Sequence, residues 1–203
     1  MINSIPLLAL VGPTAGGKTT VARALAEQKL VTLIPVWTTR PARPGEGRDP
    51  GERRFVSEDA FRRLSGEGAF GLTGGYPGTP YRFGLSPLDE PRGIALAVLR
   101  VDEVSALAAR AGGVRLVYQV CAPIDEVAER LRRRGVSEYE RQRCLSTFHA
   151  ERVAGTWVSD RTFVNRGPIT HLVTAVSRAL AADLGCVAPA SAQRSSQLLL
   201  ASH

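Results

Sequence analysis

The chain has 203 residues, enough for one ordinary domain with a substantial core. Its hydrophobic fraction of 44% is that of a globular protein, and no apolar run approaches the roughly 20 residues that a membrane span needs. The net charge of +7 is almost entirely arginine, because Lys18 and Lys29 are the only lysines. The arginines cluster in two short regions that suit small-molecule phosphates, so we expect neither a nucleic-acid nor a membrane partner.

The first residues, MINSIPLLALVG, have no basic segment and run directly into a glycine-rich turn. We therefore expect no signal peptide and a cytoplasmic location. Cys121, Cys144 and Cys186 are odd in number, far apart and not in a C-x-x-C pattern. This spacing is typical of buried or bystander thiols in a reducing compartment.

The first half of the chain alternates strands and helices around a loop-rich segment. Residues 6–11 are a short apolar run that predicts a buried parallel strand, 18–29 a helix, and 31–37 a second strand. Residues 38–54 are rich in Pro, Gly and Arg and predict a loop with turns. Ser57 is a candidate N-cap for the next helix, and residues 68–86, with six glycines, predict short strands and tight turns.

The second half resumes the alternation. We expect strands at 94–99, 114–120 and 161–165, and helices at 102–111, from Pro123 to Arg134, at 138–152 and at 168–184. Such alternation predicts an α/β fold with a parallel sheet flanked by helices. Residues 1–187 form one predicted domain without internal repeats, followed by a small, polar and flexible tail at 188–203.

The sequence G-P-T-A-G-G-K-T at 12–19 matches the P-loop pattern G-x-x-x-x-G-K-[ST], between a predicted strand and a predicted helix. Glycines let successive backbone N–H groups approach phosphate oxygens, and the helix N-terminus adds its positive dipole end. Lys18 supplies a point charge to the β- and γ-phosphates, and the Thr19 hydroxyl is a magnesium ligand. The motif predicts a P-loop NTPase fold that binds ATP and Mg²⁺ through Gly12, Pro13, Thr14, Ala15, Gly16, Gly17, Lys18, Thr19 and Thr20. The alternative is a glycine turn that only caps a helix.

Residues 38–43 read T-T-R-P-A-R, which places two arginines three residues apart between prolines. Arg40 and Arg43 form a fork suited to a phosphate dianion, although a solvated arginine loop has the same composition. With the P-loop and the later R-L-R-R-R-G at 130–135, this segment resembles the guanylate kinase family over about residues 7–184. The resemblance implies an ATP-dependent kinase with an acceptor-binding insertion at about 38–92 and an arginine-rich lid at about 132–152. It also implies that Arg40 and Arg43 hold the acceptor's phosphate.

By the same resemblance, Arg130, Arg134 and Arg143 are lid arginines near the transferring phosphoryl group, where they stabilise charge in the transition state. The alternative is a basic, solvated helix end, especially for Arg132 and Arg133. The family has a tyrosine pair whose place either Tyr76 or Tyr81 could take.

The chain departs from the family where guanine is read. Val36 stands at the serine position and Leu72 near the glutamate position, and residues 68–86 contain no acid. The strand that carries the family's aspartate is apolar at 93–99, and Asp102 is the first acid beyond it. Asp89, Glu90 or Asp102 could replace the readers if the insertion folds differently.

We therefore predict transfer of the γ-phosphate of Mg-ATP to a phosphorylated small molecule. The resemblance implies a nucleotide or a related phosphate as the acceptor, with GMP recognition left open. The alternatives are a true GMP kinase, a ribose bisphosphate-type sugar phosphate kinase, a non-catalytic binding module and a slow regulatory nucleotide sensor. The sequence leaves open whether the chain forms a homodimer. The three histidines are His149, His171 and His203. Their positions suggest neither a catalytic triad nor a set of metal ligands.

Overall fold

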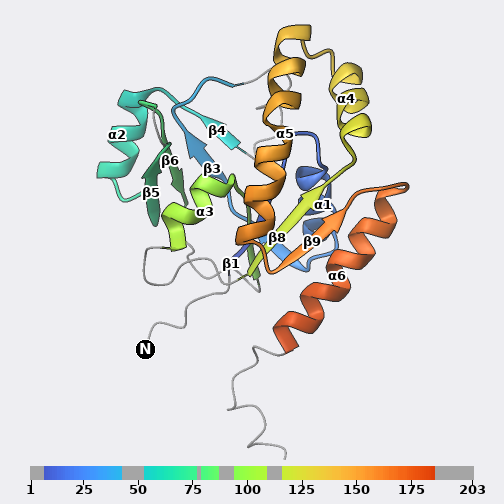
Figure 1. Ribbon diagram of the computed structural model, residues 1–203. Coiled ribbons are helices and arrows are strands. Elements are labelled where there is room, and N and C mark those ends of the chain that lie inside the picture. Colours follow the sequence, from blue (N-terminus) through green and yellow to red (C-terminus); the bar gives the residue numbers. More distant parts are fainter. Residues whose placement is uncertain (1–6, 43–52, 77–78, 87–93, 109–115, 186–203) are drawn as a thin grey trace, which may run out of the picture.

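The computed structural model describes residues 7–42, 53–76, 79–86, 94–108 and 116–185, with side chains omitted at 105–108 and 185. Within these ranges the chain forms six helices and nine strands in two sheets (Figure 1). In this part of the chain, no helix combines the length and the apolar character needed to cross a bilayer.

The core sheet has five parallel strands in the order β2-β7-β1-β8-β9. Its central strand is buried on both faces, which explains the uninterrupted apolar run of its sequence. Leu8 of that strand, for example, pairs with Leu96 on one side and Leu116 on the other. The bounds are β2 Val31–Leu33, β7 Ile94–Val98, β1 Leu7–Val11, β8 Leu116–Cys121 and β9 Arg161–Val164.

Helices cover both faces of this sheet (Figure 1). On one face, α1 (Lys18–Glu27) and α6 (Ile169–Gly185) pack against the strands, with Leu25 and Val176 in one cluster with Leu8. On the other face lie α3 (Val101–Ala108) and α5 (Glu138–Val158), and α4 (Ile124–Arg133) packs against α5. The layered arrangement confirms the predicted α/β class.

A second, smaller sheet of four strands belongs to the insertion, in the order β4-β3-β6-β5. Its strands are β3 Val36–Thr38, β4 Arg53–Phe55, β5 Leu72–Gly75 and β6 Arg82–Leu85. Helix α2 (Glu58–Gly66) covers it through Phe61, whose ring stacks on Phe70 at 4.7 Å. Gly84 of β6 lies under Phe70, where a Cβ would stand 2.8 Å from the ring, so the aromatic cluster requires glycine there.

Two predicted boundaries are wrong. The single strand expected at 31–37 is two strands in different sheets, β2 and β3, separated at Ile34–Pro35. Pro35 has no N–H to donate to a ladder, so the chain leaves the core sheet there and enters the insertion. Helix α5 continues to Val158 instead of ending near 152. The predicted N-cap is confirmed, because the Ser57 hydroxyl accepts the Ala60 N–H at 3.2 Å.

Candidate nucleotide and acceptor site

The P-loop joins the end of β1 to the start of α1 by a turn that only certain residues can make. Gly12 has φ 129° and Gly17 has φ 108°, both in the left-handed half of backbone space. A Cβ on Gly12 would lie 2.3 Å from the Val120 carbonyl oxygen of the neighbouring strand. The close approach of β8 and the positive φ together explain why glycine occupies this position.

Lys18 is the first residue of α1, and its side chain folds back over the loop. Its Nζ donates to the carbonyl oxygens of Gly12 at 2.7 Å and Pro13 at 2.9 Å. The ammonium is thus held over the same turn whose backbone N–H groups can receive phosphate. Thr19 follows it, half-buried, in the first helical turn.

Two side chains from distant parts of the chain hold the P-loop from outside. The Nδ2 of buried Asn165, just after β9, donates to the Gly16 carbonyl at 3.0 Å. Arg130 of α4 donates to the Ala15 carbonyl at 3.2 Å and forms an ion pair with Glu126 at 2.6 Å. The structure therefore places Arg130 against the P-loop backbone, and its role at the transferring phosphoryl group stays a prediction. Asn165 was not predicted as a site residue; its place at the end of the predicted strand 161–165 was the available signal.

The other lid arginines lie farther out. Arg134 is exposed at the C-cap of α4, and Arg143 pairs with Glu140 at 3.3 Å with its side chain half exposed. Phe148 of α5 packs in one cluster with Ala15 of the P-loop. Arg143 stands five residues before Phe148, so its side chain leaves the helix about 140° away from that face. In the described part of the chain, no hydrogen bond or ion pair joins Arg134 or Arg143 to the P-loop.

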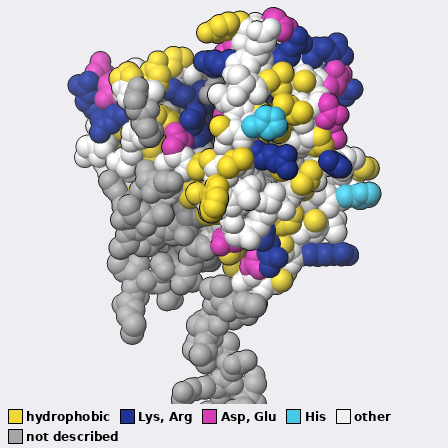
Figure 2. All heavy atoms as spheres, viewed as in Figure 1, with side chains coloured by type: hydrophobic (Ala, Val, Ile, Leu, Met, Phe, Trp, Pro, Cys, Tyr) yellow, Lys and Arg dark blue, Asp and Glu magenta, His cyan; other side chains and the backbone are white. Residues whose placement is uncertain are grey.

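Arg141 was not among the predicted site residues, yet it lies on the P-loop side of α5. It stands seven residues before Phe148, about 20° from it around the helix, and is half-buried beside Glu138. Figure 2 shows Lys and Arg side chains gathered over α4 and the start of α5, at the top of the molecule. Several of them pair with neighbouring acids, as Arg132 and Arg133 do with Glu129.

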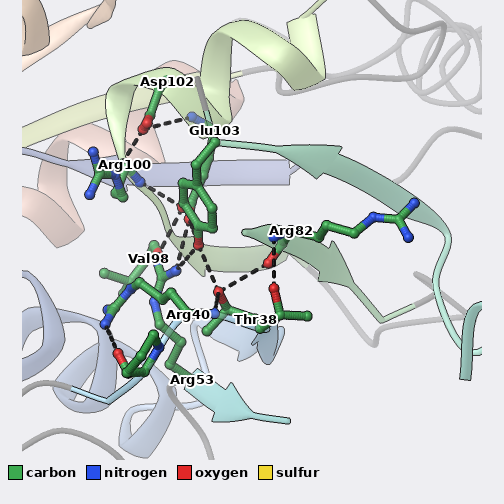
Figure 3. Close-up of polar contacts among 11 residues, drawn as sticks. Thr38, Arg40, Arg53, Arg82, Val98, Arg100, Asp102 and Glu103 are labelled. Atoms are coloured by element: carbon green, nitrogen blue, oxygen red, sulfur yellow. Dashed lines mark hydrogen bonds and ion pairs between the residues drawn. The ribbon is translucent and has the colours of Figure 1, made fainter. Parts of the chain in front are cut away.

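On the acceptor side, Arg40 follows β3. Its guanidinium donates to the Pro41 carbonyl at 2.9 Å and lies 5.2 Å from the centre of the Phe55 ring. Arg43, its predicted partner, lies outside the described residues. Tyr81 is at the surface of the turn before β6. Tyr76 is buried, and its hydroxyl points into a cluster of polar groups between the insertion and the core (Figure 3).

The centre of this polar cluster is Glu103, a residue that the motifs did not predict. Its side chain is fully buried, and its two carboxylate oxygens accept hydrogen bonds from Nη1 and Nη2 of Arg53, at 2.8 and 3.0 Å. The Tyr76 hydroxyl donates to it at 2.6 Å, and the Arg100 backbone N–H at 2.8 Å. The four contacts use the whole acceptor capacity of the carboxylate.

The charges in the cluster decide its protonation. Burial by itself raises the pKa of Glu103, but the positive charge and hydrogen bonds of Arg53, with the donors of Tyr76 and Arg100, hold that pKa below its ordinary value. Burial and the negative charge of Glu103 raise the pKa of Tyr76 to about 12. Near neutral pH, the cluster therefore contains a carboxylate, a guanidinium and a neutral phenol.

Comparison with known proteins gives the family. A guanylate kinase from Leifsonia xyli subsp. xyli is 32% identical over 194 residues, covering 91% of this chain and 72% of the relative. The chain belongs to the guanylate kinase family. Guanylate kinases from Rhodococcus jostii and Nitratidesulfovibrio vulgaris are 35% and 34% identical, over 160 and 139 residues. The chain matches no protein-family model.

The extent of the likeness differs between relatives. The match spans 73% of the R. jostii protein, 66% of the N. vulgaris protein and 63% of a guanylate kinase from Sphingopyxis alaskensis. The chain thus spans about two thirds of the length of several relatives. A crystal structure of guanylate kinase from Anaplasma phagocytophilum is similar in fold, with a TM-score of 0.59 and 23% identity over 88% of this chain and 86% of that one.

Two positions at which the resemblance leads us to expect polar base readers are occupied by buried or packed apolar side chains. Val36 is fully buried in the core, and Leu72 packs against the same cluster. Of the three acids that could replace the missing base readers, Asp89 and Glu90 lie outside the described residues. Asp102 is engaged, because one of its oxygens accepts both the Arg100 Nε at 2.9 Å and the Glu103 N–H at 3.1 Å.

The possible metal ligands around the P-loop are compatible with a magnesium ion whose other ligands come mainly from the nucleotide. Thr19 places a hydroxyl in the first turn of α1, while the described residues contain no group of three or more His, Cys, Asp and Glu side chains able to hold a metal. Mg²⁺ keeps several waters and shares oxygens with substrate phosphates, so a single hydroxyl ligand is compatible with it.

Proposed function

We propose that the chain is an ATP-dependent phosphotransferase that transfers the γ-phosphoryl group of Mg-ATP to a phosphorylated acceptor of the nucleoside monophosphate kind. The observation that supports this most strongly is the P-loop, with the Lys18 ammonium held over the turn between β1 and α1. Membership of the guanylate kinase family supports the same reaction class. An intact P-loop argues against a non-catalytic binding module.

In this proposal the residues supply position and charge. The backbone N–H groups of the P-loop (residues 12–20, except Pro13, which has none) and the Lys18 side chain bind the phosphates, and Thr19 contributes a ligand to magnesium. Bound magnesium neutralises charge on the β- and γ-phosphates. Arg40 and Arg43 hold the acceptor's phosphate, with Tyr76 and Tyr81 on the same side. An acceptor phosphate oxygen forms a bond to the γ-phosphorus as the bond to the β-phosphate oxygen breaks.

Lid arginines complete the site in the transition state. Arg130 already reaches the P-loop carbonyls, and Arg134 is exposed at the end of α4. We retain Arg134 and Arg143 as lid residues that would act after closure over the substrates. Arg141 joins them, because it already lies on the face of α5 that packs toward the P-loop.

The acceptor class has a first and a second candidate. GMP is the first, because the relatives at 32–35% identity are named guanylate kinases. The second is a phosphorylated compound whose base is not read, such as a sugar phosphate. It is favoured by Glu103, since a carboxylate that already accepts four hydrogen bonds has no capacity left for a guanine edge.

The test is an ADP-release screen with the purified full chain, ATP and Mg²⁺. The acceptors are GMP, AMP, CMP, UMP and ribose 5-phosphate, so that every compound is a stable monophosphate. We expect acceptor-dependent ADP release with at least one of them. ADP release that no acceptor accelerates would contradict the proposal.

A further inference from the structure

A buried polar chain links the insertion to the core sheet. Glu103 is in the first turn of α3, directly after core strand β7, whereas Arg53 is on β4 and Tyr76 follows β5 of the insertion. Figure 3 shows the Arg53 and Glu103 side chains meeting between the two parts of the molecule. The Arg53–Glu103 ion pair therefore joins the insertion sheet to the helix that follows core strand β7, with side-chain exposures of 13% and 0%.

The chain of contacts continues to the acceptor arginine. The Thr38 hydroxyl lies 3.1 Å from the Tyr76 hydroxyl and 3.1 Å from the Arg82 carbonyl oxygen. It also accepts the backbone N–H of Arg40 at 3.3 Å. Glu103 is thus connected to the backbone of Arg40 through only two side chains, those of Tyr76 and Thr38.

A buried ion pair is a poor source of net stability, because the cost of desolvating two charges offsets most of their attraction. Apolar contacts already join the two parts, since Val36, Phe83 and Leu85 of the insertion share a cluster with Leu7 and Ala97 of the core. The polar cluster adds a defined direction, because the bidentate Arg53–Glu103 pair and the hydrogen bond from the Tyr76 hydroxyl to Glu103 fix an orientation that apolar packing leaves looser.

We propose that Glu103 is a positioning residue for the acceptor: by holding Arg53 and Tyr76, it fixes the Thr38–Arg40 segment relative to the core strands that carry the P-loop. The inference rests on the proposed function, in which Arg40 binds the acceptor's phosphate. Phosphoryl transfer depends on the alignment of the two substrates, and a displacement of about 1 Å can cost on the order of a hundredfold in rate. Glu103 itself touches neither substrate.

The first test is kinetic and compares Glu103→Gln with Tyr76→Phe. The acceptor is the compound from the ADP-release screen with the highest kcat/KM. We expect Glu103→Gln to lower kcat/KM for the acceptor by about 10- to 100-fold, while Kd for a non-hydrolysable ATP analogue changes less than about twofold. Tyr76→Phe keeps the ring packed on Phe83 and should lower the same quantity by a smaller factor.

The matched control is Glu58→Gln, which removes the exposed pair between Glu58 and Arg82 on the insertion's surface. It should leave both parameters unchanged. Equal losses of acceptor and ATP-analogue binding in Glu103→Gln would indicate a general structural role and overturn the proposal. Unchanged acceptor kinetics in both Glu103→Gln and Tyr76→Phe would overturn it as well.

A second readout needs no acceptor. The chain has two tryptophans, and Trp157 is 84% exposed on α5, so Trp157→Phe leaves Trp37 as the sole reporter. Trp37 precedes Thr38 and donates from Nε1 to the Ser86 hydroxyl at 3.1 Å. In the Trp157→Phe background, Glu103→Gln should raise acrylamide quenching of Trp37 on the order of twofold, because the segment loosens.

The two readouts separate this inference from the proposed function. If the unmodified chain transfers phosphate to no acceptor, the proposed function fails, and the quenching of Trp37 still decides whether Glu103 fixes the segment. Quenching that is identical with and without Glu103→Gln would contradict the positioning role whatever the activity.

Discussion

At the scale of single residues, Lys18 has the most direct role in the proposed chemistry. It is one of two lysines in the chain, and its Nζ donates hydrogen bonds to the Gly12 and Pro13 carbonyl oxygens of the P-loop. We expect Lys18→Ala to lower kcat on the order of a thousandfold or more, because a charge that stabilises the transferring phosphoryl group is lost. Circular dichroism should show an unchanged fold. Lys18→Arg should also be poor, since a planar fork does not replace a point charge.

Asp183 gives a prediction about pH and stability. The Asp183 carboxylate accepts hydrogen bonds from the Arg161 guanidinium and, at 2.5 Å, from the Tyr118 hydroxyl. These bonds outweigh the effect of partial burial and lower the pKa of Asp183 to about 2. The ordinary value is about 3.9, so the stabilisation is complete above about pH 4 and is lost as the pH falls through 2.

We therefore expect Asp183→Asn to lower the free energy of unfolding by about 1–2 kcal/mol at pH 7, because a buried hydroxyl loses its charged partner. Urea titrations should show this difference shrink between pH 4 and pH 2. Asp59→Asn, at a side chain that is 94% exposed, is the control with no expected effect. A difference for Asp183→Asn that stays constant down to pH 2 would contradict the assignment.

At the scale of elements, the predictable features were those that depend on neighbours in sequence. The P-loop turn, the Ser57 cap and the apolar strands follow from local spacing. The split at Pro35 also has a local cause, which the apolar character of 31–37 concealed. Glu103 and Asn165 could not be placed, because their roles come from partners 50 and 149 residues away.

Helix α5 offers a comparison between two arginines on different faces. Arg141 lies toward the cluster that includes Phe148 and Ala15, and Arg143 points about 140° away from Phe148. If the lid closes without rotating α5, Arg141→Met should lower kcat more than Arg143→Met, with little change in Kd for an ATP analogue. The reverse order, measured by steady-state kinetics, would show that closure turns the Arg143 face inward.

At the scale of the whole molecule, family membership and the local chemistry of the acceptor side point to different degrees of selectivity. The relatives are named guanylate kinases, but here Val36 and Leu72 are apolar and Glu103 is saturated. A carboxylate paired with a base edge contributes about 1.5–3 kcal/mol, which corresponds to roughly 10- to 160-fold. We therefore expect kcat/KM for GMP to lie within about tenfold of that for other nucleoside monophosphates or sugar phosphates. A GMP preference above a hundredfold would contradict this expectation and show that guanine is read.

The measurement that tests the central claim most directly is acceptor-dependent ADP release by the full chain, compared with Lys18→Ala at equal concentration. The account predicts that at least one phosphorylated acceptor accelerates ADP release by the unmodified chain, and that Lys18→Ala, with the same circular dichroism spectrum, abolishes this acceleration. Acceptor-dependent release of equal rate in both proteins, or none in the unmodified chain, would contradict it.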